Sequence, residues 1–310
     1  MVQAARTRIA GGALEAYRTG LGVMLEASIE TALDAFPLKN CTDKIDLIFT
    51  SPPFPLVRKK RYGNRVGDEY VDWIAAVALR LKDLLAPRGS MVIELGNGWV
   101  EGQPVMSTLP LQTLLRIVED TGLYLCQQFV CHNPARLPSP VQWVNVERIR
   151  VKDSFTHIWW LAATDRPKAN NKNVLQPYKP SMQKLLRNQK YNSGRRPSGH
   201  VIGEASFLAD NGGAIPPSVL EFANTSHGRE YIEYCRAQGL VPHPATMPPG
   251  LAEFFIKFLT EKGDLVLDPF AGSNTTGSVS EILGRRWISV EADTGYVQGS
   301  RGRFAERAAT

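Results

Sequence analysis

The chain has 310 residues, 43% of them hydrophobic, and a net charge of +6, which allows one large core and a second, smaller lobe. No stretch approaches the ~18 consecutive apolar residues of a membrane-spanning helix. The first 30 residues also lack a basic-then-apolar leader pattern, so we exclude a membrane protein and expect a soluble, cytoplasmic one.

The first predicted elements alternate between strands and helices. Residues 45–50 form a β-favouring run that ends at the rigid turn Ser51-Pro52-Pro53. After a basic loop a helix is expected, with Asp68 placed to cap it and Pro87 with Gly89 placed to end it. Its apolar residues recur at helical spacing: Tyr70, Trp73, Ile74, Val77, Leu81, Leu84 and Leu85. A strand at 91–95, a helix at 111–119 and strands at 124–131 and 156–163 follow.

Between residues 164 and 249 this regular pattern is interrupted. The segment is rich in Pro, Gly, Asn, Lys and Arg, and we place the second lobe largely there. Regular patterning resumes with a helix at 251–260, a strand at 264–267, a helix at 275–283 and a strand at 287–290. Strands that alternate with helices are typical of a parallel sheet covered on both faces, so the fold class expected is α/β.

A tight turn of small residues joins the strand 264–267 to the next helix. It reads Asp268-Pro269-Phe270-Ala271-Gly272-Ser273-Asn274-Thr275-Thr276-Gly277. Such a turn lets a ligand approach the backbone and the helix N terminus. About twenty residues further on, Glu291 suits a ribose with both hydroxyls free. The two features indicate a nucleoside cofactor, but they do not choose between a nicotinamide dinucleotide and S-adenosylmethionine, although the turn lacks G-x-G-x-x-G.

The tetrapeptide Ser51-Pro52-Pro53-Phe54 also stands at the carboxyl end of a strand, where open α/β sheets bind ligands. Two prolines leave a rigid carbonyl available, the serine hydroxyl can donate or accept, and the phenylalanine offers a flat surface for stacking. These groups suit a planar amine. A purely structural turn explains most Ser-Pro-Pro sequences, so the tetrapeptide alone decides nothing.

With these two motifs more than 200 residues apart and in this order, the chain resembles the β-class amino-methyltransferases of DNA, in particular the PvuII-type N4-cytosine-specific methyltransferases. The likeness extends over nearly the whole chain. It includes residues 50–64, 69–73, 137–153, 196–200 and 243–245.

The resemblance implies an S-adenosylmethionine-dependent methyltransferase with a permuted Rossmann-like sheet and a smaller target-recognition lobe. The catalytic half would occupy residues 1–163, the target-recognition region 164–242 and the cofactor half 243–310. The target base would bind at Ser51, Pro52, Pro53 and Phe54, with Ser51 orienting the amine and the proton leaving to water. The implied cofactor contacts are Asp268, Pro269, Phe270, Gly272, Ser273, Asn274, Thr275, Thr276, Glu291, Glu94 and His243.

Three positions depart from the family pattern. Relatives usually have Gly-Asp where this chain has Glu26-Ala27, so the resemblance does not carry their acidic cofactor contact over to this place. Asn274 stands where many relatives have glycine, which we expect to perturb the turn only slightly. Glu94 stands where the PvuII-type enzyme has aspartate, and can still meet the ammonium group of the cofactor.

Positive charge is concentrated in the middle of the chain. Residues 131–210 hold 13 Lys/Arg and 5 Asp/Glu, a surplus of eight positive charges, interleaved with Trp and Tyr. A solvated face and contact with a polyanion both explain this. Together with the resemblance, it favours duplex DNA as partner, with the target base flipped out of the helix. The candidate DNA contacts are Arg58, Lys59, Lys60, Arg61, Arg65, Arg148, Arg150, Lys152, Arg195, Arg196 and His200.

Further partners and alternatives remain open. The resemblance is compatible with a homodimer and with a cognate restriction endonuclease in the host. The four cysteines form no C-x-x-C pair or Cys/His cluster, so we assign no metal ligand and no disulfide framework.

N6-adenine methylation is the nearest alternative activity, because serine at position 51 favours cytosine only statistically. C5 methylation is disfavoured because no cysteine follows a proline to act as nucleophile. An RNA or protein glutamine methyltransferase and an inactive DNA-binding protein are the other possibilities.

Overall fold

The computed structural model describes residues 7–9, 12–35, 37–42, 44–54, 65–203, 207–223 and 229–304. Residues 170–217 form one compact unit, and the parts of the chain on both sides of this segment form a second, larger one. None of the described helices is both long enough and apolar enough to cross a membrane.

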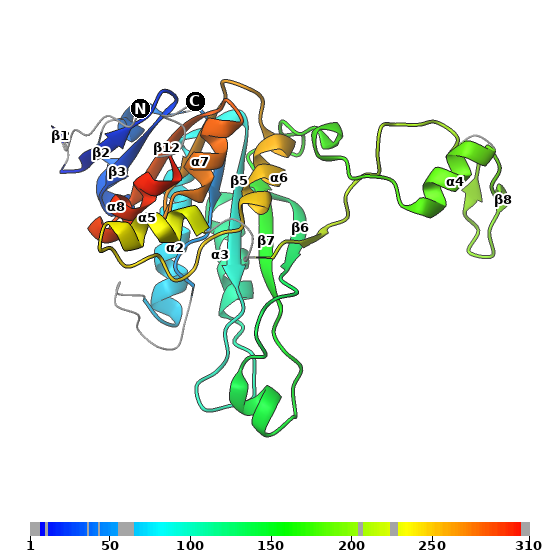
Figure 1. Ribbon diagram of the computed structural model, residues 1–310, viewed down its shortest axis with the longest axis horizontal. Coiled ribbons are helices and arrows are strands. Elements are labelled where there is room, and N and C mark those ends of the chain that lie inside the picture. The colour runs from blue at the N-terminus through cyan, green and yellow to red at the C-terminus, as the bar shows by residue number, and fades with distance from the viewer. Residues whose placement is uncertain are drawn as a thin grey trace. The chain divides into compact units, whose positions relative to one another are not determined.

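The larger unit is built on one mixed sheet (Figure 1). Among the described residues its strand order is β1-β2-β3-β12-β11-β4-β5-β7-β6-β10. All neighbouring strands from β3 to β5 pair in parallel, as the sequence predicts. The strand bounds are β1 (Thr7–Arg8), β2 (Leu14–Arg18), β3 (Gly22–Glu26), β4 (Ile45–Thr50), β5 (Leu85–Gly96), β6 (Tyr124–His132), β7 (Phe155–Ala162), β10 (Val219–Glu221), β11 (Leu265–Asp268) and β12 (Arg286–Glu291).

The expectation of a wholly parallel sheet is wrong in two places. β7 pairs antiparallel with both β5 and β6, and β2 pairs antiparallel with β1 and β3. β6 returns into β7 through a loop without the long crossover helix that parallel neighbours require, and β2 returns directly into β3. Apolar runs give the position of a strand but not its direction, so the sequence pattern did not give the direction of β7. The sequence analysis did not predict β2 or β3.

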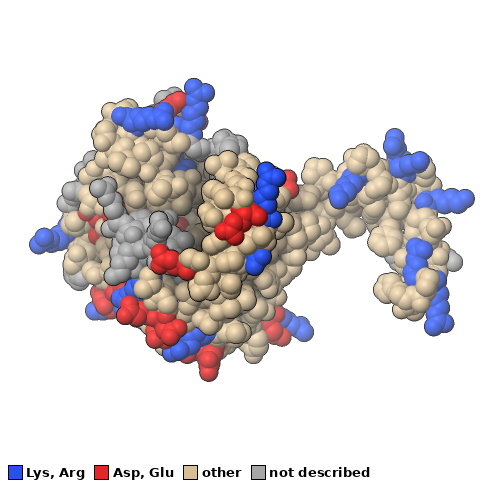
Figure 2. Space-filling model, turned by 90° about the horizontal axis from the view of Figure 1, so that it is seen from below, with Lys and Arg blue, Asp and Glu red and all other residues tan. Residues whose placement is uncertain are grey.

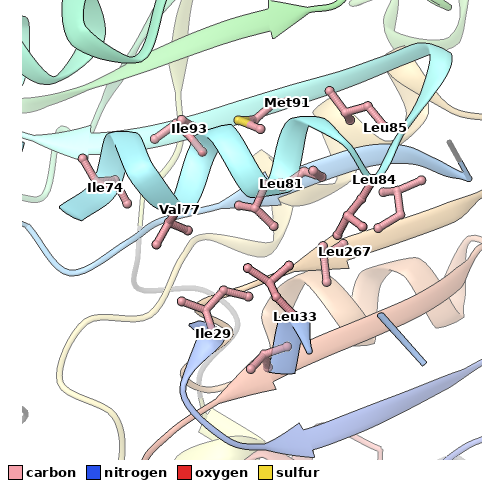
Figure 3. Close-up of a cluster of buried hydrophobic side chains, with 14 of the residues drawn as sticks. Ile29, Leu33, Ile74, Val77, Leu81, Leu84, Leu85, Met91, Ile93 and Leu267 are labelled. Carbon is pink, nitrogen blue, oxygen red and sulfur yellow. The ribbon is translucent and has the colours of Figure 1, made fainter. Parts of the chain in front are cut away.

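Helices cover both faces of this sheet, as predicted. On one face lie α1 (Ile29–Leu33), α2 (Asp68–Lys82) and α3 (Leu109–Thr121), and on the other α6 (Pro249–Leu259) and α7 (Thr275–Ile282). Strand residues alternate between the two cores: in β4, Ile48 joins the first, whereas Leu47 and Phe49 join the second. Figure 3 shows the first core, where apolar side chains of α2 face α1 and β5. The remaining α-helices of the described chain are α4 (Pro180–Asn188), α5 (Arg229–Ala237) and α8 (Thr294–Ser300).

Helix α2 ends earlier than its apolar spacing predicts. Its last residue is Lys82, and Leu85 already belongs to β5. Pro87 and Gly89 lie within β5, where the register with β4 shifts, and a Cβ on Gly89 would come within 2.6 Å of a backbone oxygen of β4. These two residues therefore form an irregularity in a strand instead of ending a helix. The N-cap is Gly67, with a φ of 58°, and not Asp68, which is the first helical residue.

Asn274 fixes the point where the small-residue turn meets α7. Its backbone is left-handed, with φ 57° and ψ 44°, a conformation that glycine adopts at lower cost than asparagine. Its side chain makes three hydrogen bonds. The Oδ1 atom accepts from Gly277 N at 3.1 Å and from Ser289 Oγ at 2.7 Å, and Nδ2 donates to the Tyr17 hydroxyl at 3.0 Å. Because Asn274 is completely buried, this network ties the turn to the core.

Two replacements of Asn274 separate its backbone conformation from its hydrogen bonds. Asn274→Gly removes the side-chain bonds and keeps the left-handed conformation at low cost, whereas Asn274→Ala removes the same bonds and also places a Cβ in that conformation. We expect both variants to be less stable than the unaltered protein, and the alanine variant to have a free energy of unfolding lower than that of the glycine variant by about 1 kcal/mol. Urea denaturation measures this difference, and an alanine variant as stable as the glycine variant would contradict the assigned conformation.

Candidate active site

A cavity of about 410 Å³ lies beyond the carboxyl ends of β4, β11 and β12. Residues 51–54, which follow β4, and the turn that begins with Asp268 both contribute to its wall. The two sequence motifs are more than 200 residues apart in the chain, and they converge here because β4 and β11 are parallel neighbours. The size is within the range typical of small-molecule sites, ~300–1,000 Å³.

All the predicted cofactor contacts lie in this wall except Asn274 and Glu94. Asn274 is turned into the core, as described above. The others in the wall are Asp268, Pro269, Phe270, Gly272, Ser273, Thr275, Thr276, Glu291 and His243. Among the described residues, no three His, Cys, Asp or Glu side chains are grouped in a way that could hold a metal ion.

Asp268 is a buried carboxylate that braces the turn. Its Oδ1 atom accepts hydrogen bonds from the Thr50 hydroxyl at 2.8 Å and from Phe270 N at 3.2 Å. Burial raises the pKa of Asp268 to about 6, although the hydrogen bonds from Thr50 and Phe270 act in the opposite direction. The carboxylate therefore joins the ends of β4 and β11 and holds the first residues of the turn.

Glu291 presents a second carboxylate to the cavity. Its Oε2 atom accepts from Gly272 N and its Oε1 atom from Asp293 N, each at 2.8 Å. Burial raises the pKa of Glu291, and these backbone bonds partly counteract the rise. Each carboxylate oxygen can accept more than one hydrogen bond, so Glu291 can still accept from ligand hydroxyls.

Gly272 and His243 leave little room between the turn and the segment before α6. Gly272 has a φ of 50°, and a Cβ on it would lie 3.1 Å from the His243 Nε2 atom. His243 is held in place by its neighbours. Its backbone N donates to the Tyr231 hydroxyl at 2.9 Å, its Nδ1 atom accepts from Ala245 N at 3.2 Å, and its ring meets Tyr296 edge-on at 4.4 Å. The His243 ring is therefore fixed directly beside Gly272 of the turn.

The catalytic turn has an acidic residue behind it. Glu94, on β5, is buried and does not line the cavity. Its carboxylate accepts a hydrogen bond from the Thr156 hydroxyl at 2.8 Å, and the Ser51 side chain lies near enough to lower its pKa. Burial raises the pKa of Glu94. This position differs from the expected contact with the cofactor ammonium, because Glu94 faces Ser51 from within the sheet.

Phe54 lies against the end of the neighbouring strand. A Cβ on Gly96, the last residue of β5, would fall 2.4 Å from the Phe54 Cε2 atom. Only a glycine allows the ring to approach this backbone so closely. Sequence reasoning did not identify Gly96, because an isolated glycine near a strand end carries no specific signal.

The sequence analysis did not assign Trp73 and Glu30 to the cavity, where they lie together with Arg65. The Trp73 Nε1 atom donates to Glu30 Oε1 at 2.7 Å, and the Trp73 ring meets Phe270 edge-on at 5.5 Å and lies below the Arg65 guanidinium, also at 5.5 Å. Burial raises the pKa of Glu30, but hydrogen bonds, mainly the one from Trp73, outweigh it and leave that pKa lowered. Helical spacing assigned Trp73 to the core, yet it lines the cavity together with Glu30 and Arg65.

The candidate DNA contacts occupy three regions. Arg58, Lys59, Lys60 and Arg61 lie outside the described residues, whereas Arg65 lines the cavity. Arg148, Arg150 and Lys152 are exposed in the loop between β6 and β7.

Arg195, Arg196 and His200 are exposed in the separate unit 170–217, which also contains α4 and the hairpin of β8 (Gly194–Arg195) and β9 (Val201–Ile202). In Figure 2, the charged side chains that can be seen on this unit are Lys and Arg.

Residues 45–301 match the family model N6_N4_Mtase, described as DNA methylase. The chain is 42% identical to the Type II methyltransferase M.PvuII of Proteus hauseri over 297 residues, which cover 95% of this chain and 87% of the relative. A solved structure named PvuII DNA methyltransferase (cytosine-N4-specific) is similar, with a TM-score of 0.74 and 37% identity over 92% of this chain and 87% of that chain. TTHA0409 from Thermus thermophilus, complexed with S-adenosyl-L-methionine, shares the fold at 20% identity, with a TM-score of 0.55 over 92% and 93% of the two chains.

Proposed function

Because this chain belongs to the DNA methylase family, we propose that it is a site-specific methyltransferase that transfers a methyl group from S-adenosylmethionine to the N4 amine of cytosine in duplex DNA. The observation that carries the proposal is that the Ser-Pro-Pro-Phe turn and the turn at Asp268 line one cavity. Cytosine is supported as the base by the 42% identity to M.PvuII and by the similar structure that is named as cytosine-N4-specific.

The residues of the cavity fit S-adenosylmethionine. Glu291 offers carboxylate oxygens to ribose hydroxyls, and Gly272 keeps the turn free of side-chain atoms on the side of His243. Phe270 and Trp73 provide aromatic rings, which attract a cation by roughly 0.5–2 kcal/mol. When bound, S-adenosylmethionine supplies a methyl group on a sulfonium, for which the protein needs no covalent intermediate.

Ser51 and Pro52 hold the target amine in this proposal. The lone pair of a cytosine amine is delocalised into the ring, so the nitrogen is a poor nucleophile. Hydrogen bonds from its N–H groups to the Pro52 carbonyl and the Ser51 oxygen draw the nitrogen toward tetrahedral geometry and strengthen as positive charge develops on it. Phe54 stacks on the base, and its contact with Gly96 fixes the plane of the ring.

Glu94 provides a route for the amine proton into the protein. The proton passes to the Ser51 oxygen while the hydroxyl proton of Ser51 passes to the nearby Glu94 carboxylate, whose pKa the Ser51 side chain lowers. Burial raises the pKa of Glu94, so it is a better proton acceptor than an exposed carboxylate. This route replaces the direct loss of the proton to water that the sequence alone suggests.

Binding of DNA and selection of the target are assigned to the basic segments. We retain residues 1–163 as the catalytic half, 164–242 as the target-recognition region and 243–310 as the cofactor half. Within the recognition region, residues 170–217 hold seven Lys/Arg and two Asp/Glu, a balance suited to phosphate contacts. The Type II names of relatives support a cognate restriction endonuclease as partner, and pairing of two copies of the chain is a further proposal.

The product of the reaction tests the function directly. The protein is incubated with radiolabelled S-adenosylmethionine and unmodified plasmid DNA, and the DNA is hydrolysed to nucleosides. We expect label in N4-methylcytosine, and sequencing of the modified positions then gives the recognition sequence. Label in N6-methyladenine would contradict cytosine as the target, and label only in RNA or protein would contradict DNA methylation altogether.

Replacing Ser51 should affect methyl transfer, whereas replacing Glu291 should affect binding of the cofactor. Ser51→Ala removes a hydrogen bond to the amine, so we expect kcat to fall about 10²-fold while the Kd of S-adenosylmethionine stays nearly unchanged. Glu291→Ala should weaken S-adenosylmethionine binding by about 1–3 kcal/mol, because ribose hydroxyls lose a charged acceptor. Calorimetric titration of each variant measures Kd, and a large loss of cofactor affinity in Ser51→Ala would show that its role is misassigned.

The role of Glu94 predicts a particular dependence of kcat on pH. Glu94 must be ionised to accept the proton, and burial raises its pKa, so kcat should fall as the pH decreases through that raised pKa. Glu94→Gln should lower kcat about 10²-fold and abolish this acidic limb. Thr156→Val serves as the matched variant: it removes a hydrogen bond that lowers the pKa of Glu94, so the limb should move to higher pH. An acidic limb that persists unchanged in Glu94→Gln would exclude Glu94 as the acceptor.

A further inference from the structure

Two loops extend as an arm from one end of the sheet (Figure 1). Residues 97–107 follow β5, and residues 133–154 connect β6 to β7. We call these two segments the arm. They contact each other, because the Arg150 Nε atom donates to the Pro104 carbonyl at 3.1 Å.

The arm begins at the catalytic turn. Thr50, the last residue of β4, pairs with Ile93 of β5, so the end of β5 runs beside Ser51 and the residues after it. β5 ends at Gly96, against which the Phe54 ring lies, and the next residue, Asn97, is the first of the arm. A duplex from which a base reaches Phe54 is therefore brought to the base of the arm.

The base of the arm is held by polar contacts. The Asn97 Nδ2 atom donates to Asp153 Oδ1 at 2.8 Å, and the Asn97 Oδ1 atom lies 2.9 Å from His157 Nε2. Asp153 is also 3.9 Å from the Arg136 guanidinium. These bonds connect both arm segments with β7, so force on the arm is resisted by the sheet.

Large apolar side chains of the arm are exposed to solvent. Val151 and Leu137 are 86% and 80% exposed, the highest values for large hydrophobic residues in the described part of the chain. Large hydrophobic side chains exposed together on one segment are typical of a site of interaction. Other exposed hydrophobic residues of the arm are Val100, Val105, Met106, Val141, Val146 and Ile149.

Cations accompany this apolar surface. Lys152, between Val151 and Asp153, reaches the carbonyls of Pro134 and Arg136 at 3.2 and 3.4 Å, and Arg148 and Arg150 are exposed. Arg148 has a φ of 57°, a left-handed conformation that is unfavourable for a non-glycine residue. Such strain tends to persist at functional sites. The arm also carries Glu101, Glu147 and Asp153, the last of them near Arg136. Its charge therefore suits phosphates close to Arg148, Arg150 and Lys152 and not over its whole surface.

We propose that the arm is a wedge that enters the base stack of duplex DNA beside the flipped cytosine, with Leu137 and Val151 filling the space that the base leaves. Apolar side chains inserted between bases are an established means of opening a duplex, and extruding a base costs a few kcal/mol that inserted side chains offset. The nearby cations contact the flanking phosphates. This inference rests on the proposed function, because it presupposes that a base of duplex DNA reaches Phe54.

The wedge is tested by comparing paired and unpaired targets. Two oligonucleotide duplexes carry the mapped recognition sequence, one with the target cytosine paired to guanine and one with it opposite an abasic site. For the double variant Leu137→Ser/Val151→Ser we expect kcat/KM to fall at least about 10-fold on the paired duplex and less than about 3-fold on the unpaired one. Leu115→Ser is the control. It changes a side chain on α3 that is 67% exposed and lies outside the arm, and it should leave both values unchanged.

Equal losses on the two duplexes, or no loss on the paired one, would overturn the wedge. Activity of the double variant on the unpaired duplex also shows that it is folded. If the unaltered protein methylates neither duplex, the proposed function itself fails, an outcome distinct from failure of the wedge alone.

Discussion

The parallel pairing of β4 with β11 is the constraint on which the site depends. Leu47 lies opposite Val266 and Ile48 opposite Leu267, so the two strands end at the same level. The Thr50 hydroxyl then reaches Asp268 at 2.8 Å, although the two residues are 218 positions apart in the chain. Ser51 and the cofactor turn are the next residues on each strand, and the register alone brings them to one cavity.

Three buried or mostly buried carboxylates surround this junction: Asp268, Glu94 and Glu291. Burial raises the pKa of each of them, and that of Asp268 rises to about 6. An acid whose pKa is higher in the folded than in the unfolded chain binds more protons when folded at pH values between the two. The free energy of unfolding therefore decreases as the pH rises through that interval, and the cost is fully present above the raised pKa. A cationic ligand in the cavity offsets part of this cost. The site is thus less stable when empty than a neutral pocket of the same shape, a usual feature of functional sites.

The parts of the fold that follow from local pattern were predictable. The strand at 45–50 has the bounds expected, and the helices after residues 108, 248 and 274 and the two last strands lie within a few residues of their expected places. Direction and pairing were not predictable, because β7 reads like any other strand, and β2 and β3 were not predicted at all. The same limit applies to the site.

Ser51, Asp268 and Glu291 stand in motifs with a chemical meaning. Glu30, Trp73, Gly96 and the position of Glu94 behind Ser51 depend on which elements become neighbours. Asn274 is intermediate. The sequence shows an asparagine where many relatives have glycine. It does not show that hydrogen bonds with Tyr17 and Ser289 stabilise this asparagine in its left-handed conformation.

The chemistry of the site does not depend on which of the two halves comes first in the chain. Parallel strands meet at their carboxyl ends whichever of them comes first in the chain, so a catalytic half that precedes the cofactor half forms the same junction. What the order changes is the connection between the halves, which here includes the separate unit 170–217. The entropic cost of closing a loop grows only with the logarithm of its length, about 0.6 kcal/mol for each doubling. A recognition unit can therefore be inserted or exchanged there at small cost to the pairing of β4 with β11, which is fixed instead by the buried side chains and the register of the sheet.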